Sequence, residues 1–386
     1  MTKRTISASY NYIDKPKIVK KEITSTSNNT IISELPKELP KIGNTDIKVA
    51  VCCIIKLENN YLLEWVNYYK NLGVDNILLY DNNDVDGPLK EDIKDIPEIA
   101  KLIDSGFIIQ HKVPNEICVQ IKYYTECYKE YNEQYDWIAF LDIDEYLTID
   151  PKLNCKNIKE YLSLNIYQNF NMIHLNWKLY DDNDLIKVEN ENYNLQNRFT
   201  RELETSLPNK TYLNKEIKSI IRGNLKNIKF VNNPHTCEGI GILCCNAIGQ
   251  SVPYNDQKSK VVIHKYAWVN HYICKTIDEF INIKMKRKGG CTPHNNTIRY
   301  SLNFFFNYNK KTPEKSKYIK KLLIDHSIPP ELLKYSNNLP IVKKMSSASL
   351  PLTRAKSNPN LVKKTIEFPN RISPLTKSGQ ALHKLF

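Results

Sequence analysis

The sequence of 386 residues lacks the marks of a membrane protein, of a secreted protein and of a zinc protein. No apolar run approaches the roughly 18 residues that a membrane-spanning helix needs, and the N-terminal Met1-Thr2-Lys3-Arg4 is not followed by the apolar region of a signal peptide. The ten cysteines include no Cys-x-x-Cys pair, and several stand in strand-like segments where reduced, buried thiols are expected. We therefore expect a soluble intracellular protein.

The body of the chain also lacks net charge, although the whole chain carries +13. Residues 1–45 hold eight Lys/Arg against four acids and residues 341–386 hold nine against one, which leaves +1 for everything between them. A near-neutral body argues against a nucleic-acid groove in the core domain, whereas the basic ends are suited to tethering on an acidic surface. Because both ends are too polar to bury a core, we predict a disordered arm at 1–45 and a disordered basic tail at 341–386.

Between these ends the sequence alternates strand-like and helix-like patterns. Apolar strands are predicted at 49–55, 76–80 and 107–113, with helices at 61–72 and 116–135 and a further strand ending at Asp142. This alternation implies an α/β fold with a mostly parallel sheet wrapped by helices. Beyond residue 150 the pattern is mixed, with a predicted helix at 278–288 and strands at 172–177, 217–221, 226–231, 239–245 and 260–264.

The segment with the clearest chemistry is Trp137-Ile138-Ala139-Phe140-Leu141, which runs directly into Asp142-Ile143-Asp144-Glu145. An apolar run ending in acids is typical of a buried strand whose carboxyl end opens at a ligand site. Two carboxylates about 4 Å apart repel by roughly 4 kcal/mol at an effective dielectric of about 20, so the pair invites a cation. Carboxylate oxygens suit Mg²⁺ or Mn²⁺, which also bind substrate phosphates. A solvated acidic turn is the alternative.

Several separated segments together resemble glycosyltransferase family 92 and its family 2 relatives. They are Lys56-Leu57-Glu58-Asn59-Asn60-Tyr61-Leu62-Leu63-Glu64-Trp65, Tyr80-Asp81-Asn82-Asn83, Trp137 to Leu147, Asn232-Asn233-Pro234-His235 and Asn270-His271-Tyr272-Ile273-Cys274-Lys275-Thr276. The resemblance covers about 49 to 290 and implies a GT-A fold, a Rossmann-like mixed sheet flanked by helices. We expect one catalytic domain at 46–340, with a donor half at about 46–150, an acceptor half at about 151–300 and a terminal helical part at 301–340.

The resemblance also implies an activity, namely transfer of a hexose from a nucleotide-sugar, a UDP-sugar, to a glycan, protein or other hydroxyl acceptor, with inversion. Asp142 and Asp144 fall on the family's metal-binding Asp-x-Asp, for Mn²⁺ or Mg²⁺, and His271 is the expected third ligand, with His235 as its alternative. The residues expected to bind the donor are Lys56, Glu58, Asp81, Asp142 and Asp144.

Inversion needs a carboxylate base near the acceptor hydroxyl. The candidates are Asp182, Glu202 and Glu204, which stand in the presumed acceptor half. Glu145 is expected to orient neighbouring groups rather than to bind the metal. Trp177 is a candidate for stacking on a sugar, although an aromatic residue beside a strand is more commonly part of the core.

Two other hypotheses fit parts of the pattern. Asp142-Ile143-Asp144 also resembles the nucleophile and acid of haloacid-dehalogenase-like phosphatases, but Tyr146 stands where that motif has Thr or Val. A catalytically inactive sugar- or nucleotide-binding relative, or a structural protein, is the other alternative, and the intact Asp142 and Asp144 argue against it. Heavy use of Lys, Asn and Ile indicates an AT-rich genome, bacterial or viral, so the expected location is the cytoplasm, or the host cytoplasm or virion.

Overall fold

The computed structural model describes residues 38–84, 90–113, 116–204, 213–287 and 300–325. Most of the predicted arm and the whole predicted tail lie outside the described residues, as does residue 288, the last of the predicted helix at 278–288. The last residues of the predicted arm contact the domain. Ile42 forms a bridge with Leu164, and the backbone N–H of Gly43 donates to the carbonyl of Ser163 at 2.8 Å.

Four parallel strands form the first part of the sheet, in the order β3, β2, β1, β4. Alternate side chains of β1 enter two different cores, because Val51 and Cys53 belong to one and Ala50 and Cys52 to the other. A strand buried on both faces needs apolar side chains at every position, which explains its continuous apolar sequence. The bounds are β1 (Val49–Ile55), β2 (Asn76–Asp81), β3 (Ile108–Lys112) and β4 (Trp137–Phe140).

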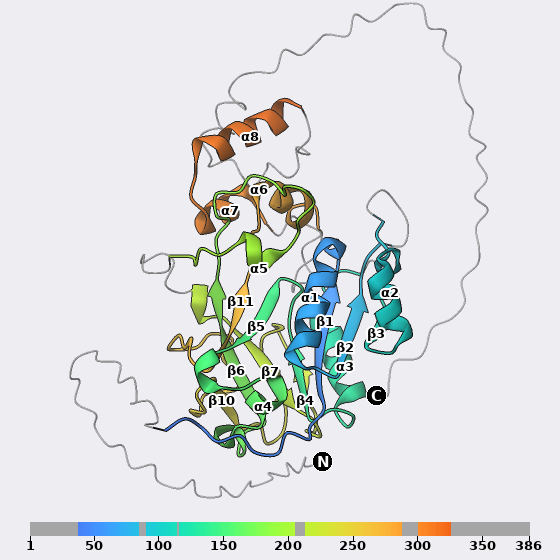
Figure 1. Ribbon diagram of the computed structural model, residues 1–386, viewed down its shortest axis with the longest axis vertical. Helices are drawn as coiled ribbons and strands as arrows, with labels where there is room; N and C mark the ends of the chain where they lie inside the picture. Colours follow the sequence, from blue (N-terminus) through green and yellow to red (C-terminus); the bar gives the residue numbers. More distant parts are fainter. Residues whose placement is uncertain (1–37, 85–89, 114–115, 205–212, 288–299, 326–386) are drawn as a thin grey trace, which may run out of the picture.

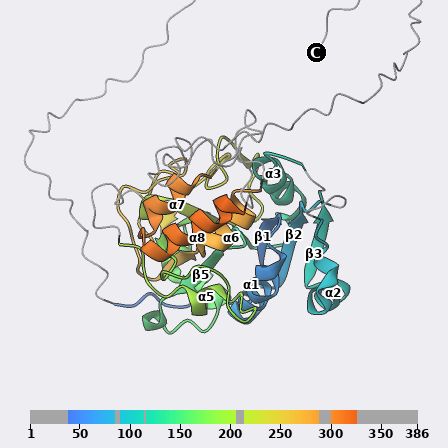
Figure 2. The same cartoon turned by 90° about the horizontal axis from the view of Figure 1, so that it is seen from above.

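Helices cover both faces of this parallel block (Figures 1 and 2). Helix α1 (Asn59–Leu72) and helix α2 (Pro97–Asp104) pack into one core, and helix α3 (Gln120–Tyr131) packs into the other. Helix α1 ends at Leu72, as the predicted range 61–72 does, and the next residue, Gly73, has a φ of 92°, a left-handed conformation that glycine adopts without strain. The short 3-10 helix η1 (Ile93–Asp95) precedes α2.

The second part of the sheet is mixed. Strand β7 runs antiparallel to both β4 and β6, β11 runs parallel to β6, and β5 pairs antiparallel with β11 at the far edge. The prediction of a mixed α/β sheet flanked by helices is confirmed. The bounds are β5 (Glu145–Ile149), β6 (Met172–Leu179), β7 (Ile217–Arg222), β10 (Cys244–Asn246), which pairs with β6, and β11 (Ala267–His271), with a separate hairpin of β8 (Lys229–Phe230) and β9 (Cys237–Glu238).

The predicted strand at 260–264 is wrong. This apolar segment is held by side chains rather than by a strand ladder, because the Ile263 N–H donates to Asn176 Oδ1 at 3.0 Å. The next residue, His264, places its ring Nε2 2.8 Å from the Trp177 carbonyl. Strand β5, which follows the acidic turn directly, was not predicted.

Short helices gather at the carboxyl ends of the parallel strands, where α6, α7 and α8 lie together (Figures 1 and 2). Helix α6 begins with a capping box of Thr276 and Glu279 and continues as a π-helix. The remaining bounds are η2 (Pro151–Leu153), α4 (Ile158–Leu162), η3 (Asn165–Tyr167), α5 (Leu195–Arg198), η4 (Leu213–Lys215), α6 (Ile277–Glu279), π-helix η5 (Phe280–Lys284), α7 (Leu302–Tyr308) and α8 (Pro313–Ile324).

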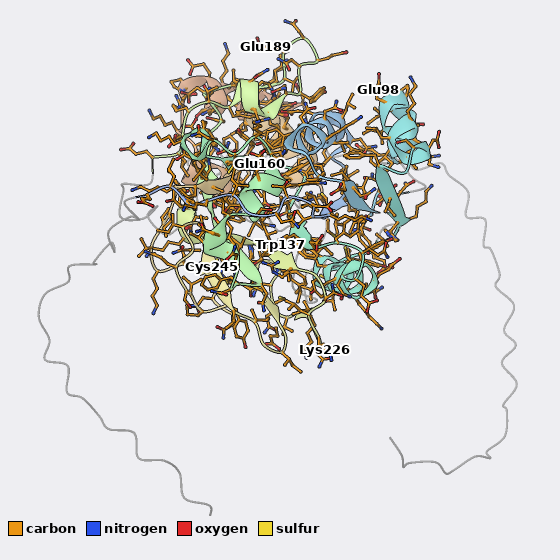
Figure 3. The ribbon with its side chains drawn as sticks, turned by 60° about the horizontal axis from the view of Figure 1, so that its bottom comes forward. Glu98, Trp137, Glu160, Glu189, Lys226 and Cys245 are labelled. Atoms are coloured by element: carbon orange, nitrogen blue, oxygen red, sulfur yellow. The ribbon has the colours of Figure 1, made fainter. Side chains whose placement is uncertain are left out.

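The side chains separate as expected for a folded α/β domain. Trp137 and Cys245 are fully enclosed, whereas Glu98, Glu189 and Lys226 project from the surface (Figure 3). Within the described ranges, we find no helix whose length and apolarity would let it cross a membrane.

Candidate functional site

The predicted acids occupy the turn between β4 and β5, where helix α1 holds the backbone from behind. The indole N–H of Trp65 donates to the carbonyls of Asp142 at 3.1 Å and Glu145 at 3.0 Å, and the Tyr69 hydroxyl donates to the Glu145 carbonyl at 2.9 Å. The turn is thereby fixed on a buried helix. The carboxylates of Asp142 and Asp144 line one cavity at the carboxyl ends of β1 and β4.

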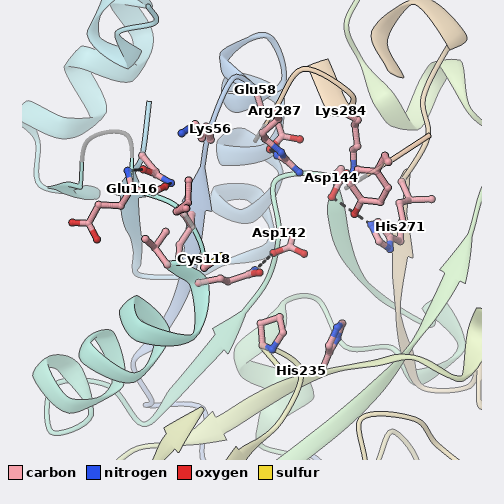
Figure 4. Close-up of a pocket in the computed structure, with 18 of the residues that line it drawn as sticks. Lys56, Glu58, Glu116, Cys118, Asp142, Asp144, His235, His271, Lys284 and Arg287 are labelled. Carbon is pink, nitrogen blue, oxygen red and sulfur yellow. Dashed lines mark hydrogen bonds and ion pairs between the residues drawn. The ribbon is translucent and has the colours of Figure 1, made fainter. Parts of the chain in front are cut away.

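This cavity collects residues that are far apart in the sequence (Figure 4). Its walls are formed by the acidic β4–β5 turn, the loop after β1, the start of α3, the β8–β9 region and the segment after β11. Its lining includes Lys56, Glu58, Asn82, Gln120, Asp142, Asp144, Trp177, His235, His271, Lys284, Arg287 and Tyr300.

Asp142 is oriented by a fixed set of donors. Its Oδ1 accepts from Gln120 Nε2 at 2.5 Å and from the Tyr124 hydroxyl at 3.3 Å, while Lys218 Nζ lies 3.0 Å from Oδ2. Burial pushes the pKa of Asp142 up, but the Lys218 ammonium holds it down at about 2. Asp142 is therefore a carboxylate at neutral pH, and one third of its side chain remains exposed.

Lys218 also joins Asp142 to Glu145. The lysine is 1% exposed, its ammonium lies 3.1 Å from Glu145 Oε2, and the same Oε2 accepts the backbone N–H of Asp142 at 2.8 Å. Burial raises the pKa of Glu145 to about 8, and the nearby Asp142 carboxylate adds to the rise against the opposing pull of Lys218. Glu145 acts on the turn rather than on the cavity, which its side chain does not line.

Asp144 carries two lysines and faces a histidine. Its Oδ2 lies 2.6 Å from Lys284 Nζ and 3.0 Å from Lys275 Nζ, and its Oδ1 lies 3.5 Å from His271 Nε2. The pairing of β5 with β11 explains this meeting, because the antiparallel register places His271 opposite Glu145. Although burial opposes it, Lys275 and Lys284 hold the pKa of Asp144 well below its usual range.

Both candidate histidines are neutral. Burial lowers the pKa of His271, whose ring packs edge-on against Trp177 with 4.2 Å between ring centroids. Burial also lowers the pKa of His235 to about 3, and its Nδ1 lies 2.8 Å from the Ile217 carbonyl. That contact requires a proton on Nδ1 of neutral His235, which leaves its Nε2 as an acceptor.

The donor atoms present fit a divalent cation in chemistry. Two carboxylates and a neutral imidazole are ligands that Mn²⁺ accepts, and Asp144 Oδ1 and His271 Nε2 already face one another. Over the described ranges, however, no three His, Cys, Asp or Glu side chains are arranged as a metal cage. Lysine ammoniums lie on the other oxygens, Oδ2 of both Asp142 and Asp144.

The remaining predicted donor residues lie at or beside the cavity. Lys56 lines it and pairs with Asp84 at 3.6 Å, and Glu58 lines it and pairs with Arg287 Nη1 at 2.5 Å. Asp81 ends β2 but does not line the cavity, and its carboxylate accepts hydrogen bonds from Asn83 and Gln110. The adjacent Asn82 lines the cavity instead.

The three base candidates do not line this cavity. Asp182 is fully buried and lies 2.6 Å from Lys315 Nζ of helix α8, so it ties that helix to the loop after β6. Glu202 is largely exposed and pairs with Lys178 at 2.5 Å, and Glu204 is exposed.

Sequence reasoning missed the cations of the site. Lys218, Lys284 and Arg287 were given no role, yet each contacts a predicted acid or lines the cavity. The sequence did carry an indication for Lys218, because this lysine stands between Ile217 and Ile220 in a predicted apolar strand. A charge in such a strand needs a buried partner.

The fold and the site define an α/β protein whose acidic ligand cavity opens at the carboxyl ends of parallel strands. The model of glycosyltransferase family 92 matches residues 47–289, and the chain belongs to that family. This confirms the resemblance drawn from the sequence and, with the mixed sheet, the predicted GT-A class of fold. It also displaces the phosphatase hypothesis.

Curated relatives match over parts of the chain. A glycosyltransferase family 92 protein of Ricinus communis is 28% identical over 115 residues, which are 30% of this chain and 20% of the relative. One of Oryza sativa subsp. japonica is 28% identical over 148 residues, 36% of this chain and 24% of the relative. The chain thus spans about a quarter or less of the length of these relatives.

Two solved structures are similar at a low level. One is S. aureus TarS 1-349, with a TM-score of 0.31 and 12% identity over 72% of this chain and 79% of that chain. The other is GalNAc-T7 with UDP, GalNAc and Mn2+, with a TM-score of 0.23 and 13% identity over 35% of this chain and 24% of that chain.

Proposed function

We propose that the protein is a metal-dependent glycosyltransferase that transfers a sugar from a UDP-sugar to a hydroxyl of a glycan or protein acceptor, with inversion. The observation that carries this proposal is the cavity itself. It sets Asp142 and Asp144 opposite Lys284 and Arg287 at the carboxyl ends of the parallel strands. Membership of glycosyltransferase family 92 supports the reaction class.

The residues of the cavity suit a nucleoside diphosphate donor. Asp142, Asp144 and His271 would hold a divalent cation, which supplies Lewis-acid neutralisation of the leaving diphosphate when bound. Gln120 and Tyr124 keep the Asp142 carboxylate in one orientation, so that little reorganisation is needed when the donor binds.

Other side chains on the wall serve the donor in different ways. Lys56 and Arg287 bring positive charge to the wall, where phosphate oxygens accept charge-assisted hydrogen bonds. Trp177 is buried between His235 and His271, so it supports the wall of the cavity from behind rather than offering an open ring face to a sugar.

Inversion requires a carboxylate that takes the proton from the acceptor hydroxyl. Asp182, Glu202 and Glu204 remain our candidates. Of these, Glu202 is the one with a largely exposed side chain at the end of β6, the strand that also carries Trp177. Asp182 is engaged with Lys315, so its substitution should disturb α8 as well as any proton transfer.

A donor screen that measures UDP release in the presence of Mn²⁺ tests the proposal. We expect release with one or a few UDP-sugars, and loss of most of it in Asp142→Ala and Asp144→Ala. Asp104→Asn, at the exposed end of α2, is the control that should leave release unchanged. Full activity in both alanine variants would refute the assignment of the site.

The wild-type chain and an Asp142→Asn variant distinguish a glycosyltransferase from the phosphatase alternative. A phosphatase of the haloacid-dehalogenase type hydrolyses a generic phosphate ester and loses that activity in Asp142→Asn. We expect no such hydrolysis. Calorimetry with UDP and Mn²⁺ that shows no binding to the wild-type chain would count against a donor site of any kind.

A further inference from the structure

One carboxylate oxygen of the site holds two ammonium groups. Lys284 Nζ lies 2.6 Å and Lys275 Nζ 3.0 Å from Asp144 Oδ2, and all three side chains are almost completely buried. A buried carboxylate needs one close cation to offset its charge, so the second exceeds what Asp144 alone requires. One of the two lysines can therefore leave without leaving the carboxylate unpaired.

The two lysines are held differently. Lys275 lies 4.8 Å above the Tyr61 ring centroid, 3.9 Å from Glu58 Oε1, and outside the cavity lining. Lys284 lines the cavity, and within the described residues Asp144 is its only carboxylate partner. It is also the last residue of π-helix η5, a type of turn that is frequently found at functional sites. Lys284 Nζ also lies 5.8 Å from the ring centroid of Tyr300, which lines the same cavity. Lys284 is therefore the lysine whose surroundings face the place where a ligand would bind.

The cluster has no surplus of negative charge. Four cations, Lys218, Lys275, Lys284 and Arg287, face the acids Glu58, Asp142, Asp144 and Glu145. A divalent cation bound by the two aspartates adds two positive charges, and at such short range like charges in a poorly solvated site repel strongly. The diphosphate of a donor in the same cavity offers the repelled ammonium a new anionic partner.

On the basis of the proposed function, we propose that Lys284 and the divalent cation compete for Asp144, and that the displaced Lys284 ammonium then binds the donor diphosphate. Lys284 is a positioning cation that links metal binding to donor binding. This link would make the two binding steps cooperative through a side chain of the protein.

The proposal predicts effects of opposite sign for one substitution. In Lys284→Met, which keeps the apolar stem, the Kd for Mn²⁺ alone falls by about fivefold or more because a competitor is gone. The Kd for UDP at saturating Mn²⁺ rises by roughly tenfold, the size of one lost charge-assisted hydrogen bond. Titration calorimetry measures both constants on the full chain.

Arg287→Met is the matched control. Arg287 lines the same cavity but pairs with Glu58 rather than with Asp144. Its loss should weaken UDP binding without strengthening Mn²⁺ binding. A tighter Mn²⁺ site in both variants would mean that any cation in the cavity has the effect, and it would overturn the specific role of Lys284.

Labelling of the wild-type chain gives a second readout that needs no variant to fold. Acetylation of Lys284, followed by mass spectrometry, should rise when Mn²⁺ is added and fall again when UDP follows. No change with Mn²⁺, or unchanged or weaker Mn²⁺ binding in Lys284→Met, overturns the inference. A wild-type chain that binds neither Mn²⁺ nor UDP instead overturns the proposed function.

Discussion

Lys218→Met tests the buried charge cluster most directly. The ammonium is 1% exposed and lies 3.0 Å from Asp142 and 3.1 Å from Glu145. At an effective dielectric of about 20, each contact is worth roughly 5 kcal/mol of attraction, but desolvating the ions costs several kcal/mol each, so the intact cluster contributes little net stability. Removing only the cation leaves the buried carboxyl groups of Asp142 and Glu145 without their positive partner, which should lower the free energy of unfolding by about 3 to 5 kcal/mol.

The loss should depend on pH. Burial already raises the pKa of Glu145 to about 8 in the wild type, and without the opposing Lys218 ammonium that pKa should rise further. The folded state then holds more protons than the unfolded state above the ordinary pKa of glutamate, so the variant loses stability as pH rises. Urea unfolding followed by tryptophan fluorescence should show a larger loss at pH 8 than at pH 6.

Two comparisons make this result decisive. Lys178→Met breaks the pair with Glu202, whose carboxylate is more than half exposed, and should cost at most about 1 kcal/mol. Adding Glu145→Gln to Lys218→Met replaces the buried carboxyl that lost its cation with a neutral amide, and at pH 8 it should return at least about 1 kcal/mol. A loss in Lys218→Met no larger than in Lys178→Met would refute the buried pairing.

Three further outcomes are expected. Removal of divalent ions with EDTA should abolish UDP binding in calorimetry, and added Mn²⁺ should restore it; UDP binding that survives EDTA contradicts a metal-dependent site. Burial lowers the pKa of His174 to about 4, so between pH 6.5 and pH 4 the unfolded state holds one more proton than the folded state. The free energy of unfolding should therefore fall by about 3 kcal/mol in total as the pH falls through this range. In His174→Gln, urea unfolding should show a smaller fall. In Gly223→Ala the new Cβ would collide with the carbonyl oxygens of Tyr135 and Asn132, and we expect a loss of about 1 to 3 kcal/mol; a variant that melts like wild type would show that this turn can relax.

The parts of the fold that local physics determines could be predicted from the sequence. The stretch 49–55 is apolar at every position because both faces are buried, and Gly73 ends α1 because it adopts a positive φ. The errors came where a tertiary contact decides. Residues 260–264 have the apolar content of a strand, but the side chain of Asn176 takes the backbone N–H that a strand partner would have accepted. Strand β5 was missed because its first residue is the acid Glu145.

The site divides in the same way. Asp142 and Asp144 follow their strand directly, so their position could be read from adjacent residues. Their neighbours come from α3, β7, β11, the segment after β11 and η5, and no local pattern sets which residue of those segments faces the acids. His271 was reached through the family resemblance, and the register of β5 with β11 supplies the physical reason for its place.

The mixture of acids and lysines around Asp142 and Asp144 affects how strongly the site can bind a metal ion. A metal site that relied on carboxylates alone would be strongly repulsive before the ion arrived, and the acids would gain protons or move apart. Here lysines from three segments keep the pKa values of Asp142 and Asp144 low, so both are charged at neutral pH. The same lysines weaken the attraction of the acids for an ion. Such a site should therefore bind Mn²⁺ only moderately by itself and tightly together with an anionic donor, because the donor is what compensates for the extra positive charge.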